Sequence, residues 1–342
     1  MMEQQERNRW LELTPEEPIE PDLPIIDCHH HFWDFPDDRF SDTRRYLLDE
    51  LLADTAGLNI RQTVFIETDA MLRADGPIAF QPVGEVEFAQ GIAAMSASGG
   101  YGEMRAAAGI VGNADLTLGD DVVPVLEALI AASPQRFRGI RERAAFIEGL
   151  PNPPRWMRRD LLLQPEFRKG FAKLRQYGLT YDAFQFHAQL PQLADLAGAF
   201  PDTIIILNHL GSPHGTPERP GCGDEVFQEW KKWLADVARH ENVFLKVGGL
   251  QMPNIGFGWH EREKPPTSDE LLERNEPWYS YAIELFGPSR CMFESNFPVD
   301  RMSCSYTVLW NQFKKLTKGF RPDERAAMFH DNAMRIYRLP RV

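Results

Sequence analysis

The 342-residue sequence has few cysteines and no long apolar run. Its four cysteines, Cys28, Cys222, Cys291 and Cys304, are widely scattered and form no C-x-x-C pair, so we expect free thiols in a reducing cytoplasm. No stretch approaches the roughly 18 apolar residues of a membrane span. Residues 1–24 are polar and contain proline, which is not the pattern of a signal peptide or an anchor. These absences predict a soluble, cytoplasmic protein.

Basic clusters and glycine-rich loops are missing too. A formal net charge of −13 repels phosphate backbones, and no Lys/Arg cluster is interleaved with aromatic residues, so nucleic-acid binding is not expected. No glycine-rich phosphate loop follows an apolar run, which disfavours a doubly wound open sheet. No Gly/Ser tract divides the chain into parts. We therefore expect a small-molecule substrate, and a few local arginines would suffice to bind an anionic one.

Short apolar runs alternate with longer amphipathic segments along the chain. The predicted strands are 25–32, 62–67, 106–111, 137–141, 180–187, 203–209, 243–247 and 291–296. The predicted helices are 45–54, 83–95, 122–132, 164–177, 190–200, 224–240, 268–286, 305–316 and 322–337. This alternation predicts an α/β fold, a single (β/α)8 TIM barrel over residues 25–342. Residues 1–24 would form an arm on the surface or against a partner subunit. Long loops after strands four and seven, 150–159 and 252–266, are expected to be lids.

Three consecutive histidines follow the apolar start of the first predicted strand. Alternation along a strand would place His29 and His31 on one face, and Cys28 and His30 on the other, toward the helix layer. Two imidazoles on one face at a strand end suit a divalent metal ion. The alternative is a pair of histidines satisfied by neighbouring hydrogen bonds.

Further polar residues fall at the predicted carboxyl ends of strands. They are Glu67 on strand two, Arg141 on four, His187 on five, His209 on six, and Glu294 and Asn296 on eight. Active sites of (β/α)8 barrels lie at this end. Barrel closure should therefore bring the histidines of strands one, five and six around a single mouth.

Five ordered motifs carry a resemblance to a known family. They are IDCHHHFWD at 26–34, LNHLGSP at 207–213, KVGGL at 246–250, MFESNFP at 292–298 and NAMRIY at 332–337. With them the sequence resembles the amidohydrolase superfamily (amidohydrolase-related family 2). Within it the sequence looks like the lactonase branch with 2-pyrone-4,6-dicarboxylate lactonase and the sugar-acid and muconolactone hydrolases. The resemblance covers residues 24 to 339.

The resemblance implies roles for several of these residues. His29, His31 and His187 would hold one divalent metal ion, with zinc expected, or the histidines would polarise a carbonyl without a metal. His187 and His209 would line the same site. Arg141 would pair with a substrate carboxylate through its planar fork. The alternative for Arg141 is a buried ion pair with Glu67 or Glu294.

The strand-eight motif departs from the family. The usual Gly-Ser-Asp is here Glu294-Ser295-Asn296, and an amide cannot act as a general base. Our hypothesis is that Glu294 is the base or a metal ligand and that Asn296 orients water or substrate. Alternatively, Glu294 balances Lys246 or Arg141 in the barrel interior. The other candidate bases are Glu67 and Asp300.

Aromatic residues in or near the predicted lids are candidate substrate contacts. They are Trp156, Trp259, His260 and Trp278, which could stack on an unsaturated ring or only pack the lids onto the barrel. Trp33, which follows strand one, is a further candidate substrate contact. Together with the arm, the lid aromatics are also candidate homo-oligomer contacts.

The function expected is that of a hydrolase. It would open a lactone or cyclic ester of a small carboxylated molecule by metal- or histidine-assisted attack of water. One alternative is a decarboxylase of an aromatic or unsaturated acid. Another is a non-catalytic small-molecule-binding barrel that lost its base with Asn296.

Overall fold

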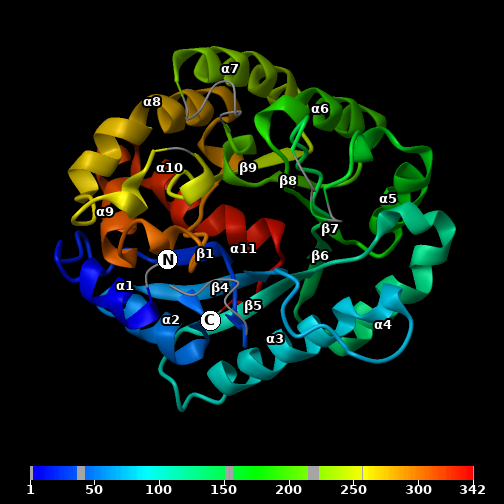
Figure 1. Ribbon diagram of the computed structural model, residues 1–342, viewed down its shortest axis with the longest axis horizontal. Coiled ribbons are helices and arrows are strands. Elements are labelled where there is room, and N and C mark those ends of the chain that lie inside the picture. The colour runs from blue at the N-terminus through cyan, green and yellow to red at the C-terminus, as the bar shows by residue number, and fades with distance from the viewer. Residues whose placement is uncertain are drawn as a thin grey trace.

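The computed structural model describes residues 3–36, 43–150, 154, 157–214, 223–255 and 257–341. Parallel strands form the centre and helices surround them (Figure 1). The strand order is β1 (Ile25–His30), β4 (Ile60–Ile66), β5 (Arg105–Gly112), β6 (Phe137–Ile140), β7 (Thr180–Ala183), β8 (Ile205–Leu207), β9 (Val243–Val247) and β10 (Cys291–Phe293). The predicted (β/α)8 barrel is confirmed.

The outer helices follow the predicted pattern closely. They are α2 (Leu48–Asp54), α3 (Pro82–Ala97), α4 (Val123–Ala132), α5 (Pro165–Gln176), α6 (Leu190–Ala199), α7 (Asp224–Ala238), α8 (Ser268–Phe286), α9 (Tyr306–Leu316), α10 (Pro322–Ala326) and α11 (Asn332–Ile336). Proline in the first turn of α3 and α5 fits because its missing N–H has no helical partner there. None of the described helices is long and apolar enough to cross a membrane.

The barrel closes at the end where the histidines lie. The backbone N–H of Asn296 donates to the carbonyl of His29 at 2.8 Å, and that of His31 donates to the carbonyl of Phe297 at 2.8 Å. These bonds join the segment after β10 to the end of β1. The sequence motifs at 26–34 and 292–298 are therefore neighbours in space.

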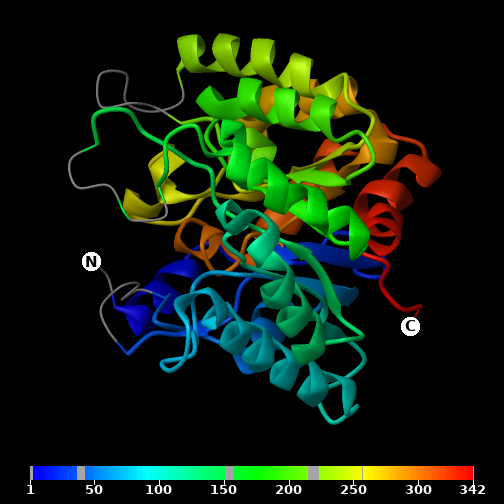
Figure 2. The same cartoon turned by 90° about the vertical axis from the view of Figure 1, so that its right-hand side faces the viewer.

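The opposite end of the barrel is covered by the C-terminal segment. Ile336, Tyr337 and Leu339 pack against Ile26 and Val64 of the barrel interior. The views in Figures 1 and 2 place α11 at this end, across the molecule from the N-terminal helix α1 (Gln4–Leu11). This end of the barrel is therefore filled with apolar side chains.

The described part of the N-terminal arm packs on the chain's own barrel. Trp10 donates its indole N–H to the carbonyl of Arg262 at 2.9 Å, and the Thr14 hydroxyl donates to the carbonyl of Pro265 at 2.8 Å. The Lys314 ammonium donates to the carbonyl of Ile19 at 2.6 Å. The arm, which contains helix α1, thus lies on the barrel surface and fastens the long loop after β9.

Several predicted boundaries are wrong, and these errors matter for the site. Residues 45–46 form strand β3 (Arg45–Tyr46), paired with β2 (Trp33–Asp34), instead of the start of a helix. Strands β7, β8 and β10 end earlier than predicted. His187, His209 and Asn296 therefore lie in the turns that follow these strands. Such turns can aim a side chain across the mouth, because they are free of the strand's strict alternation.

Candidate active site

The side chains of β1 do not keep a simple alternation. The pairing register with β4 shifts between Asp27 and His30, and such an irregularity re-aims the residues beside it. Cys28 therefore packs in the barrel interior with Phe244 and Met292, so the prediction that it faces the helix layer is wrong. Asp27 turns outward and accepts from the hydroxyl of Tyr306 at 2.9 Å.

His29 and His31 converge as predicted. Their Nε2 atoms lie 3.3 Å apart, and the two residues are 0% and 3% exposed. The Nδ1 atom of His31 is 2.8 Å from the carbonyl oxygen of Ile66. Because a carbonyl can only accept, His31 carries its ring proton on Nδ1, and its Nε2 offers a lone pair. Burial lowers the pKa of both imidazoles well below the ordinary value.

Glu294 bridges two of the histidines. Its Oε1 accepts from the backbone N–H of His209 at 3.0 Å and from its ring Nδ1 at 2.7 Å. Its Oε2 lies 2.9 Å from Nδ1 of His29. His209 has a left-handed φ of 53°, and its ring packs on Gly249, where an added Cβ would be 2.4 Å from Nδ1. The Gly-Gly after β9 thus leaves room for this ring.

The described residues that could hold a metal ion are His29, His209 and Glu294. One ligand atom from each lies within 4.8 Å of the others, and all three side chains are buried. Two imidazoles and a carboxylate suit zinc. Glu294 Oε2 has no hydrogen-bond donor among the described residues, which a cation would remedy, so the donor set fits. One contact opposes an ion: the Lys246 ammonium lies 3.2 Å from His29 Nδ1.

Arg141 is already paired. Its Nε donates to Glu67 Oε1 at 2.7 Å, its Nη2 donates to the backbone carbonyl of Glu67, and its Nη1 lies 3.4 Å from His29 Nε2. Arg143 adds a second cation, with its Nε 3.6 Å from Glu67 Oε1. The structure thus has the buried ion pair with Glu67 that we considered as the alternative for Arg141.

Asn296 joins the histidines to a buried acid. Its Oδ1 lies 3.3 Å from His31 Nε2, and its Nδ2 donates to Asp300 Oδ1 at 3.0 Å. Burial raises the pKa of Asp300 well above its usual range. Its two carboxylate oxygens accept from the amide of Asn296 and from the backbone N–H of Gln251, so Asp300 is poorly placed to act as a general base.

The family follows from comparison with known proteins. The model of the amidohydrolase family matches residues 26–339. The chain belongs to this family. This amidohydrolase is 34% identical over 338 residues to uncharacterized protein y4mH of Sinorhizobium fredii, which covers 93% of the chain and 99% of the relative. It is 27% identical over 239 residues to an L-fucono-1,5-lactonase of Burkholderia ambifaria, which covers 68% and 71%.

A solved structure shares the fold over nearly the whole length. It is an amidohydrolase from Burkholderia multivorans crystallised with bound zinc, with a TM-score of 0.70 and 23% identity over 92% of this chain and 99% of that one. This likeness shows the fold, and the family match over residues 26–339 confirms the expectation that the chain is an amidohydrolase-type enzyme.

His187 lies outside the group of His29, His209 and Glu294 in this amidohydrolase. Its Nδ1 accepts from the backbone N–H of His214 at 3.2 Å, and its Nε2 is 3.8 Å from a carboxylate oxygen of Glu229. It lines a cavity of about 650 Å³ together with Phe146, Phe186, Gln189 and Gln192. From the end of β7 it is Phe184, not a histidine, whose ring contacts His209, with ring centroids 5.7 Å apart.

The aromatic candidates have different surroundings. Trp33 is fully buried, donates to the carbonyl of Thr43 at 2.6 Å and stacks on His31 with ring centroids 5.9 Å apart. Trp259 and His260 lie in a short turn of the loop after β9 and are partly exposed. Trp156 falls outside the described residues. Trp33 therefore packs in the interior against the ring of His31.

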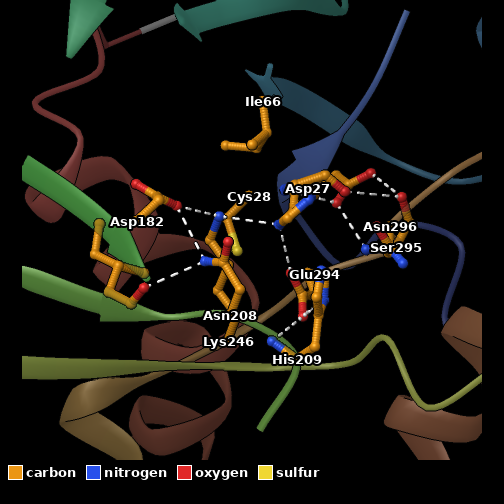
Figure 3. Close-up of polar contacts among 12 residues, drawn as sticks. Asp27, Cys28, Ile66, Asp182, Asn208, His209, Lys246, Glu294, Ser295 and Asn296 are labelled. Atoms are coloured by element: carbon orange, nitrogen blue, oxygen red, sulfur yellow. Dashed lines mark hydrogen bonds and ion pairs between the residues drawn. The ribbon is translucent and has the colours of Figure 1, made fainter. Parts of the chain in front are cut away.

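Two charged residues of the interior escaped the sequence reasoning. Lys246 was considered only as a partner of Glu294, and Asp182 was not considered at all. The Lys246 ammonium donates to Asp182 Oδ1 at 2.7 Å (Figure 3), and both side chains are fully buried. The sequence did carry a signal for Lys246 and Asp182: each is a charged residue inside a short apolar strand, where barrels usually place Val, Ile or Leu.

Proposed function

We propose that this amidohydrolase hydrolyses a lactone or another cyclic ester of a small molecule. The observation that carries the proposal is the convergence of His29, His31, His209 and Glu294 at the carboxyl ends of the barrel strands. The names of the lactonase relatives support the choice of ester. The 650 Å³ cavity lined by His187, which follows β7, is large enough for a sugar-sized ring.

The cluster contains a candidate general base and groups that can orient the ester carbonyl and the attacking water. Glu294 is the best placed base, because both carboxylate oxygens of Asp300 already accept hydrogen bonds and Glu67 is bound by Arg141. The N–H groups of Arg141 and the lone pair of His31 Nε2 can orient the carbonyl and the attacking water. A divalent ion, where one is bound by His29, His209 and Glu294, would polarise the ester carbonyl.

The pairing of Arg141 and Arg143 with acidic residues changes the class of substrate that we expect. Arg141 was the reason to expect a carboxylated molecule, and it is neutralised by Glu67. Arg143 is paired with Asp69. We therefore include neutral sugar lactones beside carboxylated ones in the proposed substrate class.

The test is a panel of neutral and carboxylated lactones assayed in ¹⁸O-labelled water. We expect a ring-opened acid that contains one solvent oxygen. Glu294→Gln should lower kcat by roughly 100-fold or more, as expected for loss of a general base. The matched control is Glu103→Gln, a glutamate whose side chain is 88% exposed. Full turnover by Glu294→Gln would contradict its role.

Two further measurements separate the alternatives. Released carbon dioxide without solvent oxygen in the product would favour a decarboxylase, whereas turnover only after Asn296→Asp would favour a non-catalytic barrel. Metal analysis, with assays before and after chelation, tests the ion. Activity that survives chelation without a stoichiometric metal would remove the ion from the proposal and leave lactone hydrolysis in place.

A further inference from the structure

The residues at the centre of the proposed chemistry are almost inaccessible in this structure. Their exposed fractions lie between 0% and 3% for His29, His31, His209 and Glu294. A substrate carbonyl must come within about 3 Å of the groups that act on it. A side chain that covers the cluster must therefore move aside when a substrate binds, and it then lies against that substrate.

Two neighbours of the cluster are fastened by buried hydrogen bonds. Trp33, behind the histidines, donates its indole N–H to the carbonyl of Thr43 at 2.6 Å. Lys246, whose ammonium lies 3.2 Å from His29, is paired with Asp182 at 2.7 Å (Figure 3). Moving either side chain would leave a buried polar group without its partner, which is costly. These two sides of the cluster are therefore closed.

Phe184 covers another side with a ring that makes no hydrogen bond. Its ring centroid lies 5.7 Å from that of His209, and the guanidinium carbon of Arg141 lies 5.7 Å from the Phe184 centroid. The side chain of Phe184 is partly exposed. Its backbone is fixed, because its carbonyl accepts from the N–H of Ala144 at 2.8 Å. The ring can thus change rotamer while the backbone stays in place, and no hydrogen bond is lost.

The same ring contacts the wall of the 650 Å³ cavity. The centroid of Phe184 lies 6.3 Å from that of Phe186, which lines this cavity together with Phe146 and Gln189. The Oε1 atom of Gln189 accepts from the backbone N–H groups of Phe146 and Phe186, each at 3.2 Å. One buried amide therefore joins two aromatic walls, and a flat ring can pack against this frame. Phe184 lies against the frame on one side and against the histidine cluster on the other.

We propose that Phe184 is a specificity-determining residue: a substrate held in this cavity reaches the histidine cluster past the Phe184 ring, which then packs against the atoms next to the reacting carbonyl. The identity of that substrate rests on the proposed lactone hydrolysis, whereas the route to the cluster does not. Because the phenyl ring fills the space beside His209, a lactone with a branch next to its carbonyl should be disfavoured. One methyl-sized group that does not fit lowers kcat/KM by about tenfold or more.

The route is tested by the reactivity of His209 toward diethyl pyrocarbonate, a small reagent that acylates imidazoles. Peptide mass spectrometry of the full-length protein, which has nine histidines, gives the rate for each one. In Phe184→Ala we expect His209 to react roughly tenfold faster than in the wild type, because an open arrangement populated at about 10% or less becomes permanent. His330, at the surface beside Asp331, should react at an unchanged rate.

The matched control variant is Phe200→Ala. Phe200 is also partly exposed, and its ring packs on Phe171 with centroids 4.9 Å apart. It should leave the rate at His209 unchanged. If Phe184→Ala is folded and His209 reacts no faster than in the wild type, or if Phe200→Ala accelerates the reaction equally, the proposed route is refuted.

Specificity is tested with pairs of lactones that differ by one methyl branch next to the carbonyl. Phe184→Ala should raise kcat/KM for the branched lactone relative to the unbranched one by about tenfold. Phe184→Leu, which keeps most of the apolar volume, should give a smaller change and serves if the alanine variant does not fold. An unchanged ratio in the folded variants would refute the specificity role. If no lactone is hydrolysed by any variant or by the wild type, the proposed function falls, and the acylation rates still decide the route.

Discussion

Replacing Arg141 tests whether it is an ion-pair partner or a receptor for a substrate carboxylate. In Arg141→Met the aliphatic stem is retained and the guanidinium is removed. Glu67 is then left as a buried carboxylate whose nearest charged partner is Arg143, with Nε 3.6 Å away. The two side chains of the original pair are 6% and 0% exposed, so water cannot replace the lost partner.

The size of the effect follows from this burial. Breaking a buried ion pair costs about 3–5 kcal/mol, and because Arg143 remains, we expect the lower end, about 3 kcal/mol. For a chain of 342 residues that corresponds to a fall in Tm of roughly 4 °C. The double variant Arg141→Met with Glu67→Gln should recover most of the loss, since no uncompensated charge is left.

Thermal unfolding of Arg141→Met, Glu67→Gln, their double variant and a control variant measures the coupling free energy between Arg141 and Glu67. The control is Arg175→Met, which removes an exposed ion pair with Asp202 and should cost less than 1 kcal/mol. If the stability losses of the two single variants simply add in the double variant, Arg141 and Glu67 do not stabilise each other, and the ion-pair interpretation is refuted. In the stable double variant, a KM raised only for carboxylated lactones would instead assign Arg141 to the substrate.

Two other predictions concern the packing of Gly249 against His209 and the cap of helix α8. Gly249→Ala places a Cβ 2.4 Å from His209 Nδ1 at a φ of +72°, whereas Gly99→Ala has a φ of +81° and no neighbour within 4 Å. Both should lose about 1 kcal/mol of stability from the strained backbone, but only Gly249→Ala should also lose activity, and equal activity of the two would contradict the packing argument. Glu270 caps α8, and the backbone N–H of Thr267 lowers its pKa from 4.5 to about 2. The carboxylate stabilises the fold by about 1 kcal/mol, since the side chain is 38% exposed. This stabilisation should be complete above pH 4.5 and vanish as the pH falls through 2. In unfolding measured against pH, the stability of Glu270→Gln should therefore converge with that of the wild type near pH 2.

Local patterns were enough to predict the barrel and the position of its active end. Parallel strands buried on both faces appear as short apolar runs, and helices that cover them have an apolar stripe, so the alternation is visible in the chain itself. The His-x-His on β1 and the polar residues after later strands could be recognised for the same reason. Boundaries were less certain, because strand ends depend on pairing with neighbouring strands, and β7, β8 and β10 are short.

Only the tertiary structure determined which polar groups pair. The register shift in β1 moved Cys28 into the interior and turned Asp27 outward, which strict alternation cannot foresee. Closure of the barrel placed Glu67 on Arg141 and Glu294 between His29 and His209. These partners are separated by up to 265 positions in the chain, and hydrogen bonding and charge pairing depend on distances of about 3 Å. The sequence thus determined the residue types and the end of the barrel where they gather, whereas their protonation and roles depend on contacts that exist only once the strands have closed.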